Sequence, residues 1–215
     1  MRIVSLISVF LLFSCSTMLL DKKKYNYEEL QNERSFIHID LNEQKLYYQD
    51  GNRVIDFPIS SSSYGIGSEE NSFKTPLGLH EISEKIGNDL PLGAVMKGRV
   101  WNQEIIEPII EDIDIEEDVI TSRIMWLDGL EPGKNKGSGI DSKARYIYIH
   151  GTAEEGLIGR PASLGCIRMI NKDVIRLFDL VEVGTKVLIY SQSLPNKTYE
   201  NFIFIVSFCL VIGVC

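Results

Sequence analysis

The sequence predicts a mainly β domain with one α-helix. Short runs of β-branched and aromatic residues recur between turns rich in glycine, asparagine and serine, a pattern typical of antiparallel strands. Only the stretch around 172–182 has the helical spacing i, i+3, i+4 and i+7, which is formed by Val174, Leu177, Phe178 and Val181.

Composition limits the function classes. The chain has 215 residues, which is room for one domain with short extensions, and 44% of them are hydrophobic, as in globular proteins. A formal net charge of −8 argues against binding of nucleic acid through its phosphates. The four cysteines are too few and too oddly placed for a disulfide framework, and no two of them form a CxxC pair, which argues against a structural zinc site.

The first predicted strands form hairpins. FIHIDL and KLYYQ are joined through Asn42-Glu43, and Asp50-Gly51 leads into RVIDFPIS. A loop follows, and a tight turn from Thr75 to Gly78 leads into the strand LHEISE. VITSRIMWL and TKVLIY predict two later strands, and EPGKNKGSGIDSK predicts a glycine-rich loop.

The segment 104–118 is strongly acidic, with eight carboxylates in fifteen residues. A calcium loop is one reading, but the ligand spacing and the glycine at the turn are missing and isoleucines interrupt the acids. We therefore expect a solvated insertion or lid, and no metal site.

Flanking residues suggest where the helix begins and ends. Asn171 is the predicted N-terminal cap, and Gly184 is predicted to end the helix. His38 and His80 fall in predicted strands without partners, so we expect them to be structural.

The segment RYIYIH, residues 145–150, is the most informative strand. Alternation places Ile147 and Ile149 on one face, and Tyr146, Tyr148 and His150 on the other. The first face is the expected core side, so the second carries the polar groups.

Once the two chain ends are set aside, Cys166 is the single cysteine left. A lone cysteine is usually an inert buried residue. Here Gly165 precedes it and allows close approach of a substrate, His150 lies sixteen residues upstream, and Arg168 should share its face. A cation or imidazolium near a thiol lowers its pKa and favours the nucleophilic thiolate.

The string YIYIHGT, followed by a loop and PASLGCIRMIN, resembles the signature of the L,D-transpeptidase family, whose catalytic domain is of the YkuD type. In that family a histidine followed by glycine precedes a Ser-His-Gly-Cys box that often continues Ile-Arg-Met. The opening hairpins and KTPLG are similar as well, so the resemblance covers about 35–190. It implies a β-sandwich-like catalytic domain, assigned to 35–191, that needs no metal or organic cofactor.

The resemblance also implies residue roles. Cys166 matches the nucleophile and His150 the histidine that activates it, while Leu164 departs from the family by replacing the histidine of the box. The backbone N–H groups around Gly165 and Cys166 would form the oxyanion hole. The other implied site residues are Gly151, which would orient the ring of His150, Ser163, Arg168 and Tyr148, which would shape the site, and Asn171, which matches a position after the box.

The implied substrate is a peptidoglycan stem tetrapeptide, which loses its terminal D-alanine and is transferred to an amine. The acceptor is left open: a neighbouring stem gives a 3–3 cross-link, a protein lysine anchors a wall lipoprotein, and water gives a carboxypeptidase or a cross-link hydrolase. A wall-binding lipoprotein without turnover is the alternative from another class. No nucleic-acid partner is expected.

The chain ends predict export. Residues 1–14 fit a signal peptide, and Leu12-Phe13-Ser14-Cys15 resembles a lipobox, so Cys15 is the predicted lipidation site, with ordinary signal cleavage or an uncleaved anchor as alternatives. Residues 15–34 read as a polar tether, 192–201 as a linker, and 202–215 as an apolar tail of undecided role. We therefore expect a periplasmic, membrane-anchored lipoprotein.

Overall fold

The computed structural model describes residues 30, 32–115 and 118–191. The predicted signal peptide, Cys15, the linker and the apolar tail lie outside the described residues, as does most of the tether. Among the described residues, no helix is long and apolar enough to cross a membrane.

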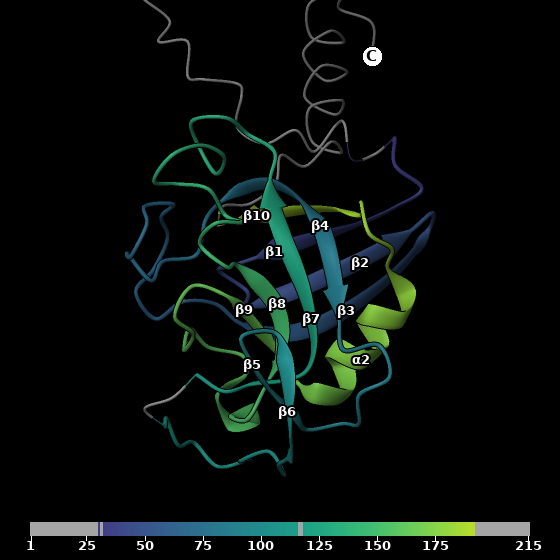
Figure 1. Ribbon diagram of the computed structural model, residues 1–215. Coiled ribbons are helices and arrows are strands. Elements are labelled where there is room, and N and C mark those ends of the chain that lie inside the picture. Colours follow the sequence, from purple (N-terminus) through teal and green to yellow (C-terminus); the bar gives the residue numbers. More distant parts are fainter. Residues whose placement is uncertain (1–29, 31, 116–117, 192–215) are drawn as a thin grey trace, which may run out of the picture.

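The described chain is built mostly from strands, as the sequence predicts (Figure 1). One α-helix, α2 (Asn171–Leu180), and a short 3-10 helix, η1 (Glu155–Leu157), accompany them within the described ranges. The strands are β1 (Ser35–Asp40), β2 (Lys45–Asp50), β3 (Arg53–Ser60), β4 (Gly78–Ile86), β5 (Ala94–Lys97), β6 (Val100–Ile105), β7 (Ile120–Gly129), β8 (Tyr148–Thr152), β9 (Ile167–Met169) and β10 (Lys186–Tyr190).

The sheet closes on itself. Its order is β4-β10-β1-β2-β3-β9-β8-β7, and β7 pairs with β4 again, while β5 and β6 extend from the first part of β7. Most neighbours are antiparallel, but β1 with β10 and β8 with β9 are parallel. The arrangement is therefore a barrel-like sandwich, and β8 and β9 lie side by side within it.

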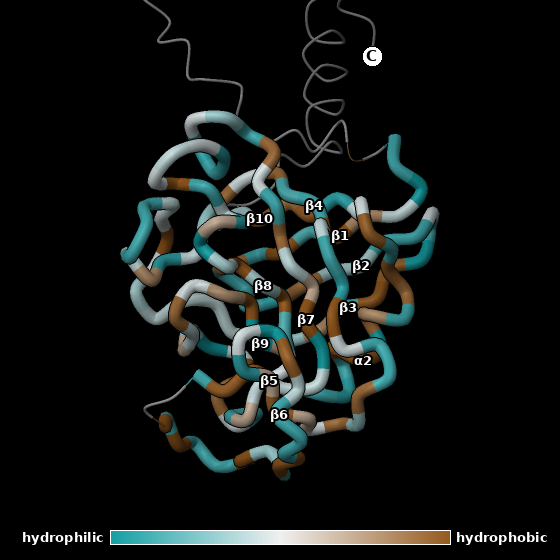
Figure 2. Tube along the Cα trace, viewed as in Figure 1, coloured by the Kyte–Doolittle hydropathy of each residue, from teal (hydrophilic) through white to brown (hydrophobic). Residues whose placement is uncertain are grey.

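The main core fills the space between the sheet and α2, where brown apolar segments of Figure 2 meet. Val174, Leu177 and Phe178 on α2 share one buried cluster with Ile149 on β8 and Ile167 on β9. Burying each such side chain stabilises the fold by about 1.5–3 kcal/mol. The alternation predicted for Ile147 and Ile149 is confirmed, and this packing fixes which face of β8 and β9 is left for chemistry.

The start of α2 differs from the prediction. The side chain of Asn171 makes no cap; its Nδ2 donates to the Thr152 carbonyl at 2.8 Å and its Oδ1 accepts from the Thr121 hydroxyl at 2.6 Å. The Asn171 backbone N–H donates instead to Glu155 Oε1 at 2.7 Å. A carboxylate from η1 thus satisfies this end of the helix, where negative charge is favourable, and the Asn171 side chain ties β7 to β8.

The end of α2 also differs. The helix stops at Leu180, since Val181 is already extended, and Gly184 is not its terminator. Gly184 has φ 93° and lies in the turn closed by the Thr185 N–H and the Glu182 carbonyl. Its left-handed backbone serves the turn into β10.

The two strand histidines have partners, so that part of the prediction is wrong. The Nε2 of His80 lies 2.9 Å from the Ser142 hydroxyl, and the His38 ring stacks on Tyr47 with centroids 4.8 Å apart. Burial lowers the pKa of each histidine to about 4. Both are uncharged residues of the framework at neutral pH.

The acidic segment 104–118 makes more contacts with the rest of the domain than a purely solvated insertion would. Asp112 forms an ion pair with Arg160, and the Ile115 N–H donates to Glu154 Oε1 at 2.7 Å. Within the described ranges, no group of three or more His, Cys, Asp or Glu residues is placed to hold a metal ion. The sequence also missed β5 and β6, whose short runs are interrupted at Gly98.

Candidate active site

Cys166 lies directly before β9, on the side of the sheet facing away from the main core. Its Sγ donates to the Tyr146 carbonyl and accepts the Tyr148 N–H, each at 3.4 Å, and the side chain is partly exposed. Tyr146 has φ 58°, a left-handed conformation that is uncommon for a bulky residue. The backbone at the start of β8 therefore holds the thiol.

His150 lies on β8 in register with Arg168 of β9, two residues beyond Cys166. Since alternate residues of a strand share a face, the imidazole and the thiol are diagonal neighbours on adjacent strands. The Nδ1 of His150 lies 2.8 Å from the Gly151 carbonyl, so Nδ1 carries the proton. Nε2 is then a base, and it is buried without a hydrogen-bond partner among the described residues.

Ser163, Gly165 and Thr75 are linked by hydrogen bonds next to Cys166. The Ser163 hydroxyl donates to the Cys166 carbonyl at 2.6 Å and accepts the Gly165 N–H at 3.2 Å. Thr75, from the turn predicted at 75–78, donates to the Gly165 carbonyl at 3.0 Å. Gly165 has φ 120°, and a Cβ there would lie 3.3 Å from the Lys74 carbonyl, so glycine suits this position.

Arg168 is buried and paired with two carboxylates. Its Nε lies 3.0 Å from Asp118 and its Nη1 lies 2.9 Å from Glu154, which is itself fully buried. The guanidinium charge is therefore balanced within the protein, and Arg168 links β9 to the end of the acidic segment.

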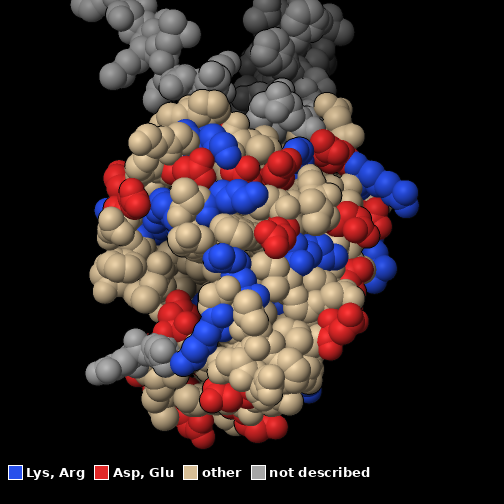
Figure 3. Space-filling model, in the orientation of Figure 1, with Lys and Arg blue, Asp and Glu red and all other residues tan. Residues whose placement is uncertain are grey.

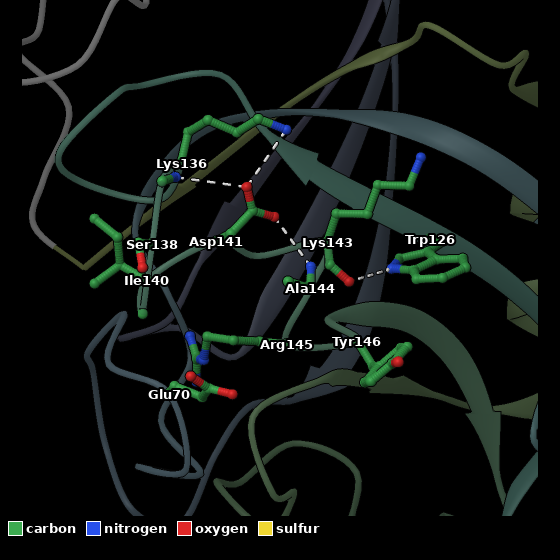
Figure 4. Close-up of a pocket in the computed structure, with 12 residues that line it drawn as sticks. Glu70, Trp126, Lys136, Ser138, Ile140, Asp141, Lys143, Ala144, Arg145 and Tyr146 are labelled. Atoms are coloured by element: carbon green, nitrogen blue, oxygen red, sulfur yellow. Dashed lines mark hydrogen bonds and ion pairs between the residues drawn. The ribbon is translucent and has the colours of Figure 1, made fainter.

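Two cavities lie near the segments that hold the thiol. One, of about 650 Å³, is lined by Glu70, Trp126 and residues 136–141 and 143–146 (Figure 4). The other, of about 350 Å³, is lined by residues that include Tyr64, Leu164 and Arg168. Cys166 itself lines neither cavity: the first reaches Tyr146, whose carbonyl accepts from the thiol, and the second reaches Leu164, two residues before Cys166.

The family model for the L,D-transpeptidase catalytic domain, YkuD, matches residues 34–189. The chain belongs to this family. Two Bacillus subtilis proteins named as candidate L,D-transpeptidases are similar to it: YqjB is 42% identical over 66 residues, and YkuD is 56% identical over 48 residues. These segments span 29% and 22% of this chain, and 36% and 29% of the two relatives.

Solved L,D-transpeptidase structures are more distant. An L,D-transpeptidase from Mycobacterium smegmatis is 17% identical, with a TM-score of 0.46, over 74% of this chain and 59% of its own. The catalytic domain of the E. faecium L,D-transpeptidase acylated by ertapenem is 20% identical, with a TM-score of 0.43, over 74% of this chain and 98% of its own. Family membership rests on the family model.

In this L,D-transpeptidase domain the resting thiol is not a thiolate. Burial, and next the nearby Asp118 carboxylate, raise the pKa of Cys166 to about 12, against the smaller lowering by the Tyr148 N–H, Arg168 and Arg145. Burial lowers the pKa of His150. The net pKa shift of the thiol is therefore opposite to the one expected from a nearby cation, because burial of the thiol and the Asp118 carboxylate outweigh Arg168.

The site contains residues that sequence reasoning did not single out. Asp118 and Glu154 balance Arg168, and Trp126 packs edge-on against Tyr148 with ring centroids 5.6 Å apart. Arg99, between β5 and β6, donates to the Tyr148 hydroxyl at 3.1 Å. A Lys-Gly-Arg turn between two short apolar runs was the one sequence signal that could have located Arg99.

Proposed function

We propose that this domain is a peptidoglycan L,D-transpeptidase in which Cys166 is the nucleophile and His150 the base. The observation that carries the proposal is an imidazole with a fixed tautomer and a free acceptor atom. Gly151 holds Nδ1, Nε2 is buried without a partner among the described residues, and β8, which carries His150, is paired with β9, directly before which Cys166 lies. An oriented imidazole next to a thiol is the arrangement required for nucleophilic catalysis.

The acylation step moves the thiol proton to His150 Nε2 as Sγ attacks the carbonyl of the third residue of the stem peptide. Collapse of the tetrahedral intermediate breaks the peptide bond, and the imidazolium returns the proton to the departing D-alanine amine. A thioester to Cys166 remains. An acceptor amine then attacks the thioester, gives up a proton through His150, and releases the thiol.

The hydrogen bonds near the thiol change which backbone N–H we propose as the oxyanion donor. The Gly165 N–H donates to the Ser163 hydroxyl, so it supports the loop in the free protein. We assign the Cys166 N–H to the developing oxyanion, with Gly165 shaping the approach. Each such donor contributes roughly 10²–10³-fold in rate when it is aimed at the oxyanion.

Two separate cavities near the segments that hold Cys166 would give transfer one subsite for the donor and one for the acceptor. The larger cavity, next to Tyr146, suits the donor peptide. The smaller one, next to Leu164, suits the acceptor, and its shape would select among a stem amine, a protein lysine and water. The carboxypeptidase or hydrolase and the wall-binding protein without turnover are the corresponding alternatives.

The location proposed for the protein is outside the cytoplasmic membrane. Residues 1–14 would direct export, and lipid attached to Cys15 would anchor the domain to a membrane next to its substrate. Metabolic labelling with a fatty-acid analogue, with Cys15→Ser as the control, tests the anchor. Persistent labelling of the Cys15→Ser protein would contradict it.

The decisive experiment for the activity is incubation of the purified protein with isotopically labelled muropeptides, followed by mass spectrometry. A 3–3 linked dimer supports the transpeptidase, a tripeptide alone supports the carboxypeptidase, and loss of an added cross-linked dimer supports the hydrolase. Recovery of unchanged peptide with no acyl-enzyme would overturn the catalytic proposal. A Cys166→Ala sample controls for contaminating enzymes.

A further inference from the structure

A cation on the β5–β6 turn has no role in the chemistry proposed above. Arg99 has φ 68°, and its guanidinium carbon lies 4.5 Å from the centroid of the Trp126 ring and 5.2 Å from that of Tyr146. Its Nη1 donates to the Tyr148 hydroxyl at 3.1 Å. Trp126, Tyr146 and Tyr148 form a cluster of aromatic rings beside Cys166, the aromatic shelf, and Arg99 lies on it.

The charge of Arg99 is not balanced by an ion pair within the part of the chain that the structure describes. The ring contacts and the Tyr148 hydroxyl use the face and one edge of the guanidinium, which has five N–H donors. The chain has a net charge of −8, and acidic and basic groups lie side by side on the face drawn in Figure 3. Donors therefore remain for an anionic ligand.

Lys143 adds a second positive charge to the same shelf. Its Nζ lies 5.6 Å from the centroid of the Trp126 ring, and it lines the larger cavity with Tyr146. No carboxylate of the described residues pairs with it either. In Figure 4 the Lys143 side chain and the Trp126 indole lie on the same side of the cavity.

Tyr148 connects the guanidinium of Arg99 to the sulfur of Cys166. Its backbone N–H contacts Cys166 Sγ, and the hydroxyl of the same side chain contacts Arg99. The sulfur and the guanidinium thus contact the two ends of one tyrosine residue. A leaving group that extends from the attacked carbonyl along Tyr148 therefore approaches the guanidinium.

We propose that Arg99, supported on the aromatic shelf, binds the free carboxylate of the residue that leaves during acylation. This inference rests on the proposed function, and it assigns a specificity-determining role: the domain selects donor peptides that end one residue after the attacked carbonyl. Arginine suits the task because its planar fork matches a carboxylate.

The test is a two-by-two comparison of protein and peptide. The protein is wild type or Arg99→Gln, and the donor is a stem tetrapeptide with a C-terminal acid or the same peptide with a C-terminal amide. For wild type we expect kcat/KM for the acid to exceed that for the amide by roughly tenfold, as for loss of a charge-assisted hydrogen bond at a partly exposed site. For Arg99→Gln we expect the two peptides to react at equal rates.

A structural role for Arg99 gives a different pattern. If Arg99→Gln lowers the rates with acid and amide by the same factor, Arg99 only supports the turn and the inference is overturned. Arg53→Gln, at the exposed start of β3, is the matched control and should keep the wild-type preference. Arg99→Lys should keep part of the preference, because it retains the charge without the fork.

A second readout separates this inference from the proposed function. Calorimetric binding of the acid and the amide to Cys166→Ala needs no turnover, and the acid should bind roughly tenfold more tightly only when Arg99 is present. Equal affinities for the two peptides would overturn the carboxylate site. Absence of acyl-enzyme in the wild-type protein, alongside a binding preference, would overturn the catalytic proposal alone.

Discussion

Arg168 and Arg99 both lie near Cys166, but they differ in burial, in ion pairing and in the element that carries them. Arg168 is buried on β9 and neutralised by Asp118 and Glu154, whereas Arg99 is partly exposed on a turn, lies against aromatic rings and has no ion-pair partner among the described residues. A buried and balanced cation positions the elements that carry it. A cation without an ion-pair partner on the aromatic shelf is available to a ligand.

This contrast bears on the prediction that Arg168 lowers the pKa of Cys166. Its spacing from Cys166 indicates a cation beside the thiol, and the structure puts it on the same strand face. The spacing reveals neither the burial of the thiol nor Asp118, which is remote in sequence, and both raise the pKa of the thiol. A nearby cation lowers the pKa of a thiol only when burial and nearby carboxylates do not outweigh it.

The largest effect is expected from Cys166→Ala, which removes the sulfur atom proposed as the nucleophile. Turnover should disappear while the circular dichroism spectrum and melting temperature stay near those of wild type, because the side chain is small and partly exposed. Release of D-alanine is the measurement. Residual turnover above a few per cent would show that the nucleophile is another group.

The next effect is that of the base. His150→Ala should reduce the single-turnover acylation rate by about 10²–10⁴-fold, the usual contribution of general acid–base catalysis. Leu164→His places an imidazole on the Arg168 side and should change the rate only modestly, since Leu164 is 43% exposed at the rim of the smaller cavity. If Leu164→His instead raised the rate by about 10²–10⁴-fold, the natural domain would have lost most of its activity. That result would favour the wall-binding alternative.

Stability should separate the two arginines directly. Arg168→Met leaves the Asp118 and Glu154 charges without their cation and should lower the free energy of unfolding by about 3–5 kcal/mol in urea titration. Arg99→Gln should change it by no more than about 0.5 kcal/mol, as for most surface substitutions. Equal losses would erase the contrast between a structural and a ligand-facing arginine.

The smallest effects are in the pH dependence of the free protein. With the pKa of Cys166 raised to about 12, alkylation by iodoacetamide should be slow at neutral pH and should keep rising above pH 9, the ordinary value for the thiol. The pKa of His150 is lowered, so the imidazole stays a base at pH 6.5 and the acid limb of kcat/KM should fall below that pH. A plateau of alkylation near pH 7 would show a resting thiolate instead.

The predictable part of the fold is the part governed by local pattern. Alternating strands such as FIHIDL and the spacing of Val174, Leu177 and Phe178 locate β1 and α2. The string around His150 and Cys166 places these two residues on β8 and directly before β9, which are adjacent strands. Interactions between distant segments were not predictable: Glu155 meets the start of α2, and Asp118 meets Arg168. Arg99 reaches the site only because the β5–β6 pair folds back along β7.

The hydrogen bond from the thiol to the Tyr146 carbonyl has a consequence for the lifetime of the enzyme. Oxidants and electrophiles attack thiolates, and a thiol that stays protonated at rest offers them little to attack. In the proposed mechanism the proton passes to His150 Nε2 only when a peptide is bound, so reactivity is coupled to occupancy. Between substrates the protonated Cys166 would then be protected from oxidants and electrophiles.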